Sequence, residues 1–466
     1  MLTMSENQRN VIQLPLNHKI WLEGRAGTGK TTVGVERMLY LMNSGVPGNT
    51  ILVFVPQRSL ATPYREALSS PGVVAGGMPT ISTIGGLAQR MIDLFWPVIA
   101  EEAGFAHPDS PPTFLNHETT QYYVAHLVRP LFDQGRFNSV TIARNRIYSQ
   151  IIDNLNKSAV VGFPYTEIGD RLRQAWSGEP GQSRVYEDAQ YCASLFREYC
   201  LQHNLLDFSL QIDVFWYQLC KSQICKEYLR NSYRNLIIDN IEEDVPVTHD
   251  MLVDWLPFAG SALVIYDKDA GYRRFLGADP LGAYRLKQQC SEIIEFNESY
   301  VTPSEIQSLA LALKASLHHD PVPKSKHDPR LALCFKSHTF YPQMLDWIAD
   351  EIESLIENDG ISPKDIVILA PILSDSLRFS IVNRLELKNI PVRTHRPSRS
   401  LREEPATTCL LTLASIAHHE WGFIPSKFDV THLATTLKAG LSVITVAYSL
   451  NLGWIRRPGC FPGAPV

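Results

Sequence analysis

Short apolar runs separated by longer amphipathic segments give the first indication of the fold. Four runs, rich in Ile, Val and Leu, have the length and composition of strands buried on both faces of a parallel sheet. After the first run, apolar residues recur at helical spacing from Val33 to Met42. A strand, a helix and a second strand in this order predict the opening of an α/β domain. The four predicted strands cover residues 20–22, 51–55, 235–239 and 262–266.

Between the second and third runs, from about residue 111 to 205, the apolar residues follow a helical period. A Gly, Pro and Ser stretch at 177–183 interrupts this pattern. We therefore expect a mostly helical insertion between strands of the sheet. Its helices are predicted at residues 117–132, 145–155 and 186–203.

A second α/β alternation starts near residue 331, after a proline-containing boundary at 303–329. It predicts a helix, a strand and a helix, at 341–358, 365–370 and 374–388. Residues 430–466 contain no Asp or Glu and show no helix or strand period. We expect an irregular tail that is not the native end of a lobe, as in a truncated or frame-disrupted gene, with chance composition as the alternative.

Composition places the chain among ordinary soluble proteins of several domains, with 466 residues, 45% hydrophobic and 20% charged. The net charge of −5 means that any nucleic-acid site must be local. No apolar run reaches the roughly 18 residues of a membrane span, and no signal-peptide pattern is present, so we expect a cytoplasmic protein. The eight cysteines lack metal-ligand spacing and are expected to be buried free thiols. The doublets His318-His319 and His418-His419 are expected to be solvated or packed.

Residues 24–31 read Gly-Arg-Ala-Gly-Thr-Gly-Lys-Thr and match the P-loop pattern Gly-x4-Gly-Lys-Ser/Thr at every fixed position. In this strand-to-helix loop, glycines let backbone N–H groups and the helix N-terminus face a phosphate. We expect Lys30 to reach the β- and γ-phosphates and Thr31 to coordinate Mg²⁺. A glycine-rich turn that matches by chance is the alternative. The predicted nucleotide-binding residues of the loop are Gly24, Ala26, Gly27, Thr28, Gly29, Lys30, Thr31 and Thr32.

The third apolar run ends in Asp239, and a buried strand that ends in Asp has the shape of a Walker B motif. Its carboxylate is expected to hold the Mg²⁺ of a bound nucleotide. Such strands also arise by chance, so the interpretation depends on the P-loop upstream. About two hundred residues separate Lys30 from Asp239. A compact P-loop kinase or switch GTPase has no room for this spacing without an insertion.

Several segments, taken in order, resemble the UvrD/Rep/RecB-like branch of superfamily 1 DNA helicases and translocases, over roughly residues 1–420. Gln8 stands sixteen residues before Gly24, where that family has the glutamine that reads the adenine of ATP. Asp267 to Asp279 is similar, from the second position onward, to the family segment Gly-Asp-Pro-Asp-Gln-Ser-Ile-Tyr-Arg-Phe-Arg-Gly-Ala-Asp. The other similar segments are Ile51 to Ala61, Thr83 to Ala88, Leu206 to Leu210, Ile366 to Leu369 and Leu387 to Val392.

This resemblance implies an α/β P-loop NTPase with a RecA-like motor lobe, a helical insertion and a partial second RecA-like lobe. It implies ATP and Mg²⁺ as cofactors and single-stranded or duplex-end DNA as the partner. Arg58, Arg65, Thr83 and Tyr272 are candidate DNA contacts, with a solvated or packed side chain as the alternative for each. The implied segments are 1–110 with 206–300 for the first lobe, 111–205 for the insertion, 301–330 for a linker, 331–429 for the second lobe and 430–466 for the tail.

Departures from the family pattern concern the groups that cleave ATP. Where the family has Asp-Glu-x-Gln-Asp, this chain has Asp239-Asn240-Ile241-Glu242-Glu243, so an amide replaces the general base. Glu242 or Glu243 are candidate replacements at a distance of two or three residues. The γ-phosphate-sensing Gln aligns with Ala270, a later Arg with Leu276, and a phosphate-stabilising Arg with Val301. Nothing resembling the last two helicase motifs follows.

Three hypotheses remain open from the sequence. The first is an ATP-driven helicase or translocase that acts on DNA in repair or recombination. The second is an ATP-binding, hydrolysis-poor subunit of a helicase–nuclease complex with a nuclease or recombination partner, since Val55-Pro56-Gln57 is closer to the AddB-like pattern. The third is an unrelated P-loop enzyme such as a kinase, against which the ordered helicase-like segments argue.

Overall fold

The computed structural model describes residues 4–70, 76–178, 183–394, 405–418, 420 and 424–436. The chain forms two compact units, residues 1–333 and residues 334–466. Of the predicted tail, residues 437–466 lie outside the described residues.

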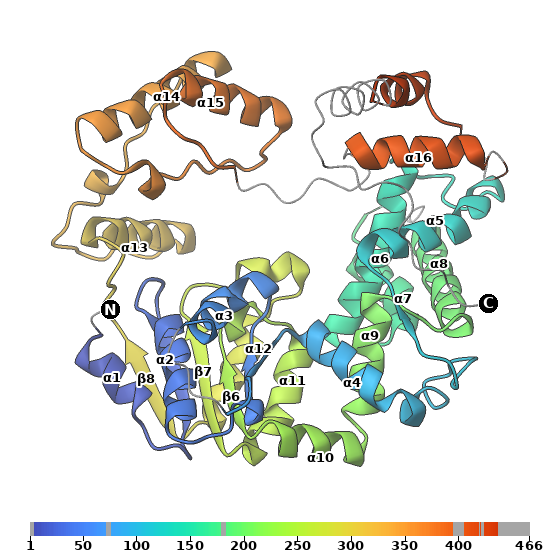
Figure 1. The fold of residues 1–466 in the computed structure, drawn as a ribbon, viewed down its shortest axis with the longest axis horizontal. Helices are drawn as coiled ribbons and strands as arrows, with labels where there is room; N and C mark the ends of the chain where they lie inside the picture. The colour runs from blue at the N-terminus through green and yellow to red at the C-terminus, as the bar shows by residue number, and fades with distance from the viewer. Residues whose placement is uncertain are drawn as a thin grey trace, which may run out of the picture. The chain divides into compact units, whose positions relative to one another are not determined.

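A parallel sheet of six strands lies at the centre of the first unit (Figure 1). Its strand order is β3-β2-β6-β7-β1-β8, and every neighbouring pair runs parallel. The four predicted strands correspond to β1, β2, β6 and β7, so the predicted α/β fold class is confirmed. The strands are β1 (Lys19–Gly24), β2 (Ile51–Phe54), β3 (Thr80–Ser82), β6 (Asn235–Ile238), β7 (Ser261–Asp267) and β8 (Glu292–Phe296).

Alternate residues of the central strands enter two different hydrophobic cores, which explains why the strand sequences are continuously apolar. In β1, Ile20 and Leu22 pack into one core and Trp21 into the other. The first core also receives residues of α1, α2 and α3, and the second receives residues of α4, α9, α10 and α11. These helices are α1 (Glu6–Ile12), α2 (Lys30–Asn43), α3 (Thr62–Leu68), α4 (Ile84–Ile99), α9 (Phe208–Val214), α10 (Gln223–Ser232) and α11 (Pro246–Trp255).

The predicted helical insertion consists mainly of four helices. The first and last residues of the inserted segment lie side by side. Residues of β4 (Thr113–Phe114) pair in parallel with β5 (Leu205–Leu206), so the chain leaves and re-enters the sheet region at one place. Apolar residues of the insertion belong to the same core as Trp21 and Phe54, which joins the insertion to the sheet. The insertion helices are α5 (His117–Asp133), α6 (Arg144–Val161), α7 (Ile168–Ala175) and α8 (Ser183–Gln202).

The rest of the first unit follows β7. Three short helical segments, α12 (Pro280–Tyr284) among them, lead from β7 toward β8, and α13 (Ser304–His318) follows β8. Seven cysteines are described; all are free and five are buried.

In the second unit, two helices predicted from the sequence pack through a small apolar core (Figure 1). They are α14 (Tyr341–Glu357) and α15 (Asp375–Leu387), with Leu345 and Ile381 buried between them. A further helix, α16 (Pro405–Ala417), lies later in the chain.

Two predictions for the second unit are wrong. Residues 365–370 do not form the expected strand, because the described part of this unit offers no strand for them to pair with. Val367 and Leu369 are accordingly 74% and 90% exposed. The described start of the predicted irregular tail is also ordered, since residues 427–436 are helical.

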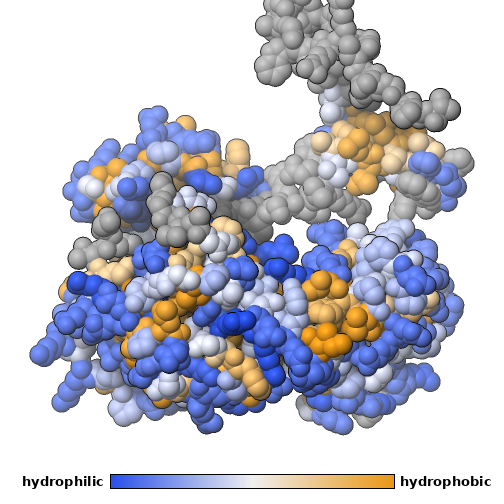
Figure 2. Space-filling view, turned by 60° about the horizontal axis from the view of Figure 1, so that its bottom comes forward, coloured by the Kyte–Doolittle hydropathy of each residue, from blue (hydrophilic) through white to orange (hydrophobic). Residues whose placement is uncertain are grey.

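Figure 2 shows a face that is mostly hydrophilic, with separate apolar patches. Within the described ranges, we find no helix with the length and low charge needed to cross a membrane.

Candidate nucleotide-binding site

The P-loop joins β1 to α2 with a backbone that requires glycine at two positions. Gly27 and Gly29 have φ values of 79° and 78°, in the left-handed region, and Gly29 is the N-cap of α2. A Cβ atom on Gly27 would lie 2.5 Å from the Ser299 hydroxyl and 2.8 Å from a Val301 methyl group. The loop therefore places the free N–H groups of the helix N-terminus at the end of β1, where an anion is stabilised.

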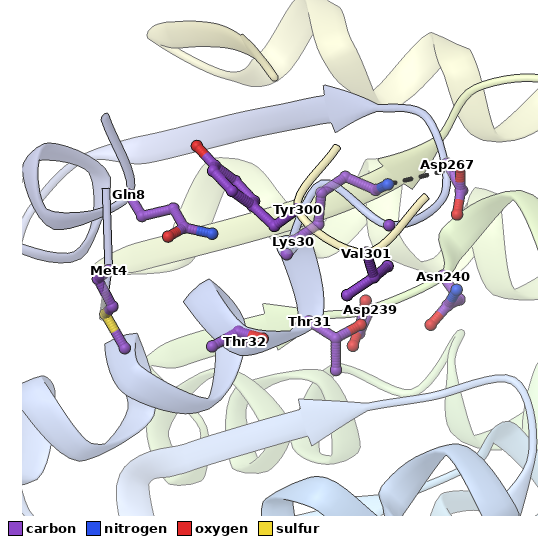
Figure 3. A pocket seen from close by; sticks show the side chains of 12 residues that line it. Met4, Gln8, Lys30, Thr31, Thr32, Asp239, Asn240, Asp267, Tyr300 and Val301 are labelled. Carbon is purple, nitrogen blue, oxygen red and sulfur yellow. Dashed lines mark ion pairs between the residues drawn. The ribbon is translucent and has the colours of Figure 1, made fainter. Parts of the chain in front are cut away.

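A cavity of about 360 Å³ lies beside this loop (Figure 3), within the usual range for small-molecule sites. It brings together Gln8 from α1, the P-loop, and Asp239 from the end of β6. Of the predicted loop residues, Gly24, Ala26 and Thr28 do not line it. The lining residues are Met4, Gln8, Gly27, Gly29, Lys30, Thr31, Thr32, Asp239, Asn240, Asp267, Tyr300 and Val301.

The three loop residues outside the cavity have other environments. Gly24 lies between β7 and β8, where a Cβ would approach the Phe296 carbonyl oxygen to 2.6 Å. Thr28 is buried, and its hydroxyl donates to the Arg25 carbonyl at 2.9 Å. Ala26 is exposed. These positions shape the loop and do not face the cavity.

Lys30 is a buried cation held over the loop. Its Nζ donates to the Arg25 carbonyl oxygen at 2.6 Å and lies 3.4 Å from Asp267 Oδ1 (Figure 3). Burial lowers the pKa of Lys30, and the Asp267 carboxylate opposes that shift. The ammonium group therefore has one carboxylate, one carbonyl and, at 3.5 Å, the Thr28 hydroxyl as its partners, and a phosphate is an anion of the kind that it binds.

Asp239 is buried at the end of β6 with one oxygen satisfied. Tyr64 donates to its Oδ2 at 2.9 Å, while its Oδ1 has no hydrogen-bond partner among the described residues. Burial raises the pKa of Asp239, and hydrogen bonds from Tyr64 and Thr31 oppose that shift. Thr31 also reaches the cavity (Figure 3). A carboxylate with a free oxygen beside a hydroxyl fits a hard cation such as Mg²⁺.

Gln8 is fixed in place by the start of α1. Ser5 Oγ accepts from the Gln8 backbone N–H at 3.2 Å, and Gln8 Oε1 accepts from Ser5 N–H at 3.0 Å. This reciprocal capping box orients the side chain. Its Nε2 contacts the Thr28 carbonyl oxygen at 3.4 Å and faces the cavity beside Tyr300 (Figure 3).

Glu242 and Glu243 both follow Asp239, but neither belongs to the lining of the described cavity. Glu242 is fully buried, and its Oε2 accepts from the Asp267 backbone N–H at 2.9 Å. Burial raises its pKa to about 8. Asn240, which does line the cavity, directs its amide toward Glu242 Oε1 at 3.5 Å. The place of Glu242 outside the cavity lining and its bond to the Asp267 N–H, rather than its pKa, argue against a role as the base.

The four candidate DNA contacts have different environments. Arg58 and Arg65 are exposed, on the short helical segment after β2 and on α3. Tyr272 is 80% exposed. Thr83 caps α4, where its hydroxyl accepts from Gly86 N–H at 3.2 Å. Arg273, next to Tyr272, donates to the Pro56 carbonyl oxygen at 3.4 Å, which brings the Tyr272 turn beside the segment that carries Arg58.

Sequence reasoning missed three residues that line this cavity, Met4, Asp267 and Tyr300. Tyr300 lines the cavity beside Gln8, and its backbone N–H donates to the Gly27 carbonyl oxygen at 2.9 Å. The signal was present, since Tyr300 directly precedes Val301, which the sequence aligns with the family's phosphate-stabilising Arg. Asp267, the partner of Lys30, was recognised as the end of a strand without a role.

A six-stranded parallel sheet with a P-loop at the end of its β1 strand defines an α/β P-loop NTPase of the RecA-like motor class. The family model for the UvrD/REP helicase N-terminal domain matches residues 4–280. The chain therefore belongs to the UvrD-like superfamily 1 helicases. A search of the curated proteins finds no match.

Proposed function

We propose that this chain is an ATP-binding DNA helicase or translocase of the UvrD/RecB-like type, which acts on single-stranded or duplex-end DNA in repair or recombination. One observation carries the proposal. The buried, half-satisfied Asp239 carboxylate lies with Thr31 and Lys30 around one cavity that Gln8 also lines. These groups match the parts of a Mg²⁺-nucleotide: adenine, phosphates and cation.

The chain's residues would have distinct roles at this site. Lys30 would bind the β- and γ-phosphates, Thr31 and Asp239 would hold Mg²⁺, and the Gln8 amide would orient the adenine. Bound Mg²⁺ would neutralise phosphate charge. Tyr300, beside Gln8, is placed to contact the base.

We also propose the division of the chain into functional segments. Residues 1–110 and 206–300 form the first motor lobe and 111–205 its helical insertion. Residues 301–330 form a linker and 331–429 a partial second lobe. The two ends of the insertion, paired through β4 and β5, support the first of these divisions.

Substitution of the P-loop lysine tests nucleotide binding. We expect Lys30→Ala to weaken MgATP binding at least tenfold, about 1.4 kcal/mol, because it removes the cation that lines the cavity. Calorimetric titration of both proteins measures the change. Lys157→Ala, on the exposed side of α6, is the matched control and should bind like the wild type. Equal affinity in Lys30→Ala and wild type would refute the assignment.

A second candidate function is a hydrolysis-poor ATP-binding subunit of an AddB-like helicase–nuclease complex. It is favoured by the amide of Asn240 and the methyl groups of Val301 in the lining of the cavity, because the amide cannot take a proton and the methyl groups cannot stabilise phosphate charge. Tight MgATP binding without turnover, in a chain that copurifies with a nuclease subunit, would support this function. Rapid turnover by the isolated chain would exclude it.

A further inference from the structure

A turn between β7 and α12 presents large aromatic side chains to solvent. Tyr272 and Phe275 are 80% and 78% exposed, and Arg274 between them is exposed as well. They belong to a short 3₁₀ helix, η8 (Tyr272–Leu276). Exposed aromatic rings beside a guanidinium group are suited to stacking on the bases of a single strand. Rings so exposed stack productively only if the backbone beneath them is held in place.

The Glu243 carboxylate provides that hold. Its Oε1 accepts from the backbone N–H groups of Gly271 at 3.0 Å and Tyr272 at 2.9 Å. Its Oε2 accepts from Arg273 N–H at 3.1 Å. Three consecutive N–H groups converging on one anion form a nest, which Gly271 permits through its φ of 95°. With both oxygens engaged, Glu243 is occupied as an anchor and is not available as a base.

The same short segment also fixes the far end of the turn. The backbone N–H of Asp279 donates to the Asp244 carbonyl oxygen at 3.0 Å. Glu243 and Asp244 are consecutive, so two adjacent residues hold both ends of the 271–279 segment. This arrangement ties the aromatic turn to one point on the loop that follows β6.

That point lies one helical turn from the nucleotide pocket. Asn240 lines the pocket, and its carbonyl oxygen accepts from the Glu243 N–H at 3.0 Å within η6 (Ile241–Glu243). Asp239, immediately before it, is the proposed Mg²⁺ ligand. A displacement of this loop would therefore move the anchor of the turn with it.

We infer that Glu243 is a positioning residue that holds the Tyr272 and Phe275 rings ready to stack on single-stranded nucleic acid and connects them to the nucleotide pocket. This inference rests on the proposed function, because it assumes that the turn meets DNA. It gives Glu243 the role of fixing the backbone of the turn that would contact DNA.

Amide hydrogen exchange tests the anchor without any ligand. In Glu243→Ala, the amides of Gly271, Tyr272 and Arg273 should exchange at least tenfold faster than in the wild type. Glu243→Gln keeps one acceptor oxygen and should give an intermediate rate. The matched control Glu198→Ala, at an exposed glutamate of α8, should leave these amides unchanged. Unchanged exchange in Glu243→Ala would overturn the inference.

Binding of a labelled oligothymidylate tests the consequence for DNA. We expect Glu243→Ala and Tyr272→Ala each to lose at least fivefold in affinity, and the double variant to lose no more than the larger single loss. The MgATP affinity of these variants should stay within twofold of the wild type. An unchanged affinity shows that the nucleotide pocket is intact and that only the turn has changed. Additive losses would overturn the inference. Failure of the wild type to bind would instead overturn the proposed DNA role, while the exchange rates still decide whether Glu243 holds the turn.

Discussion

Asn240 lines the nucleotide pocket with its backbone in the left-handed region, at φ 56° and ψ 44°. Asn and Asp adopt this conformation more readily than other residues that carry a Cβ atom. The residue that stands where relatives have the general base is therefore also well matched to its backbone. Chemistry and conformation at this position are linked, and a substitution that restores the family's Glu affects both.

Two substitutions at Asn240 separate these effects. Asn240→Glu should raise the hydrolysis rate only modestly and lower the free energy of unfolding by about 1 kcal/mol, the scale of left-handed strain. Asn240→Asp adds a carboxylate without that strain and should unfold like the wild type. Urea denaturation with steady-state ATPase assays on both variants measures the two effects. Equal stability of the two variants would contradict the strain argument.

Glu242 should make stability depend on pH. Burial raises its pKa to about 8 in the folded protein, against a usual value of about 4.3 in an unfolded chain. Between these values the folded state holds a proton that the unfolded state has released, so the free energy of unfolding falls as pH rises through this window. Glu242→Gln keeps an oxygen that accepts from the Asp267 N–H. Its side chain does not ionise, so the variant lacks this contribution to the pH dependence of stability.

The variant should match wild-type stability near pH 4 and exceed it by about 1 kcal/mol or more at pH 9. Asp239 and Asp267 also have raised pKa values but are present in both proteins, so they largely cancel in the difference. Urea denaturation at the two pH values provides the test. A difference that does not grow with pH would show that Glu242 is ionised in the folded state.

At the level of elements, an apolar run that predicts a strand forms one only where neighbouring strands are present to pair with it. The runs at 51–55 and 366–370 are similarly apolar, yet β2 lies between β3 and β6 while the latter has no strand partner in the described part of its unit. Tertiary pairing, which a single sequence does not display, decides between these outcomes.

The matched pair Val53→Thr and Val367→Thr tests this difference. Val53 is fully buried in β2, and a buried hydroxyl there should cost about 1 to 3 kcal/mol of stability. Val367 is mostly exposed, and the same change should stay within about 0.5 kcal/mol. Urea denaturation of both variants supplies the comparison. A large loss for Val367→Thr would mean that this segment is covered in solution.

The elements that could be predicted carry strong local signals. β1, β2, β6 and β7 each contain at least three consecutive apolar residues, and the P-loop is a contiguous motif. β3 has three residues, and β8 mixes Glu292 and Glu295 with its apolar residues, so neither gives a clear pattern. Contacts such as Glu243 with Gly271, or Lys30 with Asp267, join distant segments and could not be read from spacing.

At the scale of the whole molecule, turnover depends on groups that several segments must bring to one cavity. Asn240 and Val301 enter the pocket from two of them, and Ala270 stands in a third where relatives have a phosphate-sensing Gln. We expect this chain to hydrolyse ATP far more slowly than the roughly 10 s⁻¹ typical of enzymes, with little stimulation by single-stranded DNA. Steady-state ATPase assays measure this rate with and without DNA. Lys30→Ala is the background control. Fast, DNA-stimulated hydrolysis that disappears in Lys30→Ala would refute the expectation.

The β4 and β5 ladder has a consequence for how this chain tolerates change in length. Because the two ends of the insertion lie side by side, the connection between them sets no geometric demand on the sheet, and lengthening it adds little closure entropy. The apolar face shared with Trp21 and Phe54 sets the limit instead. A shorter or foreign segment grafted at this junction would preserve the motor sheet only if it covered those side chains equally well.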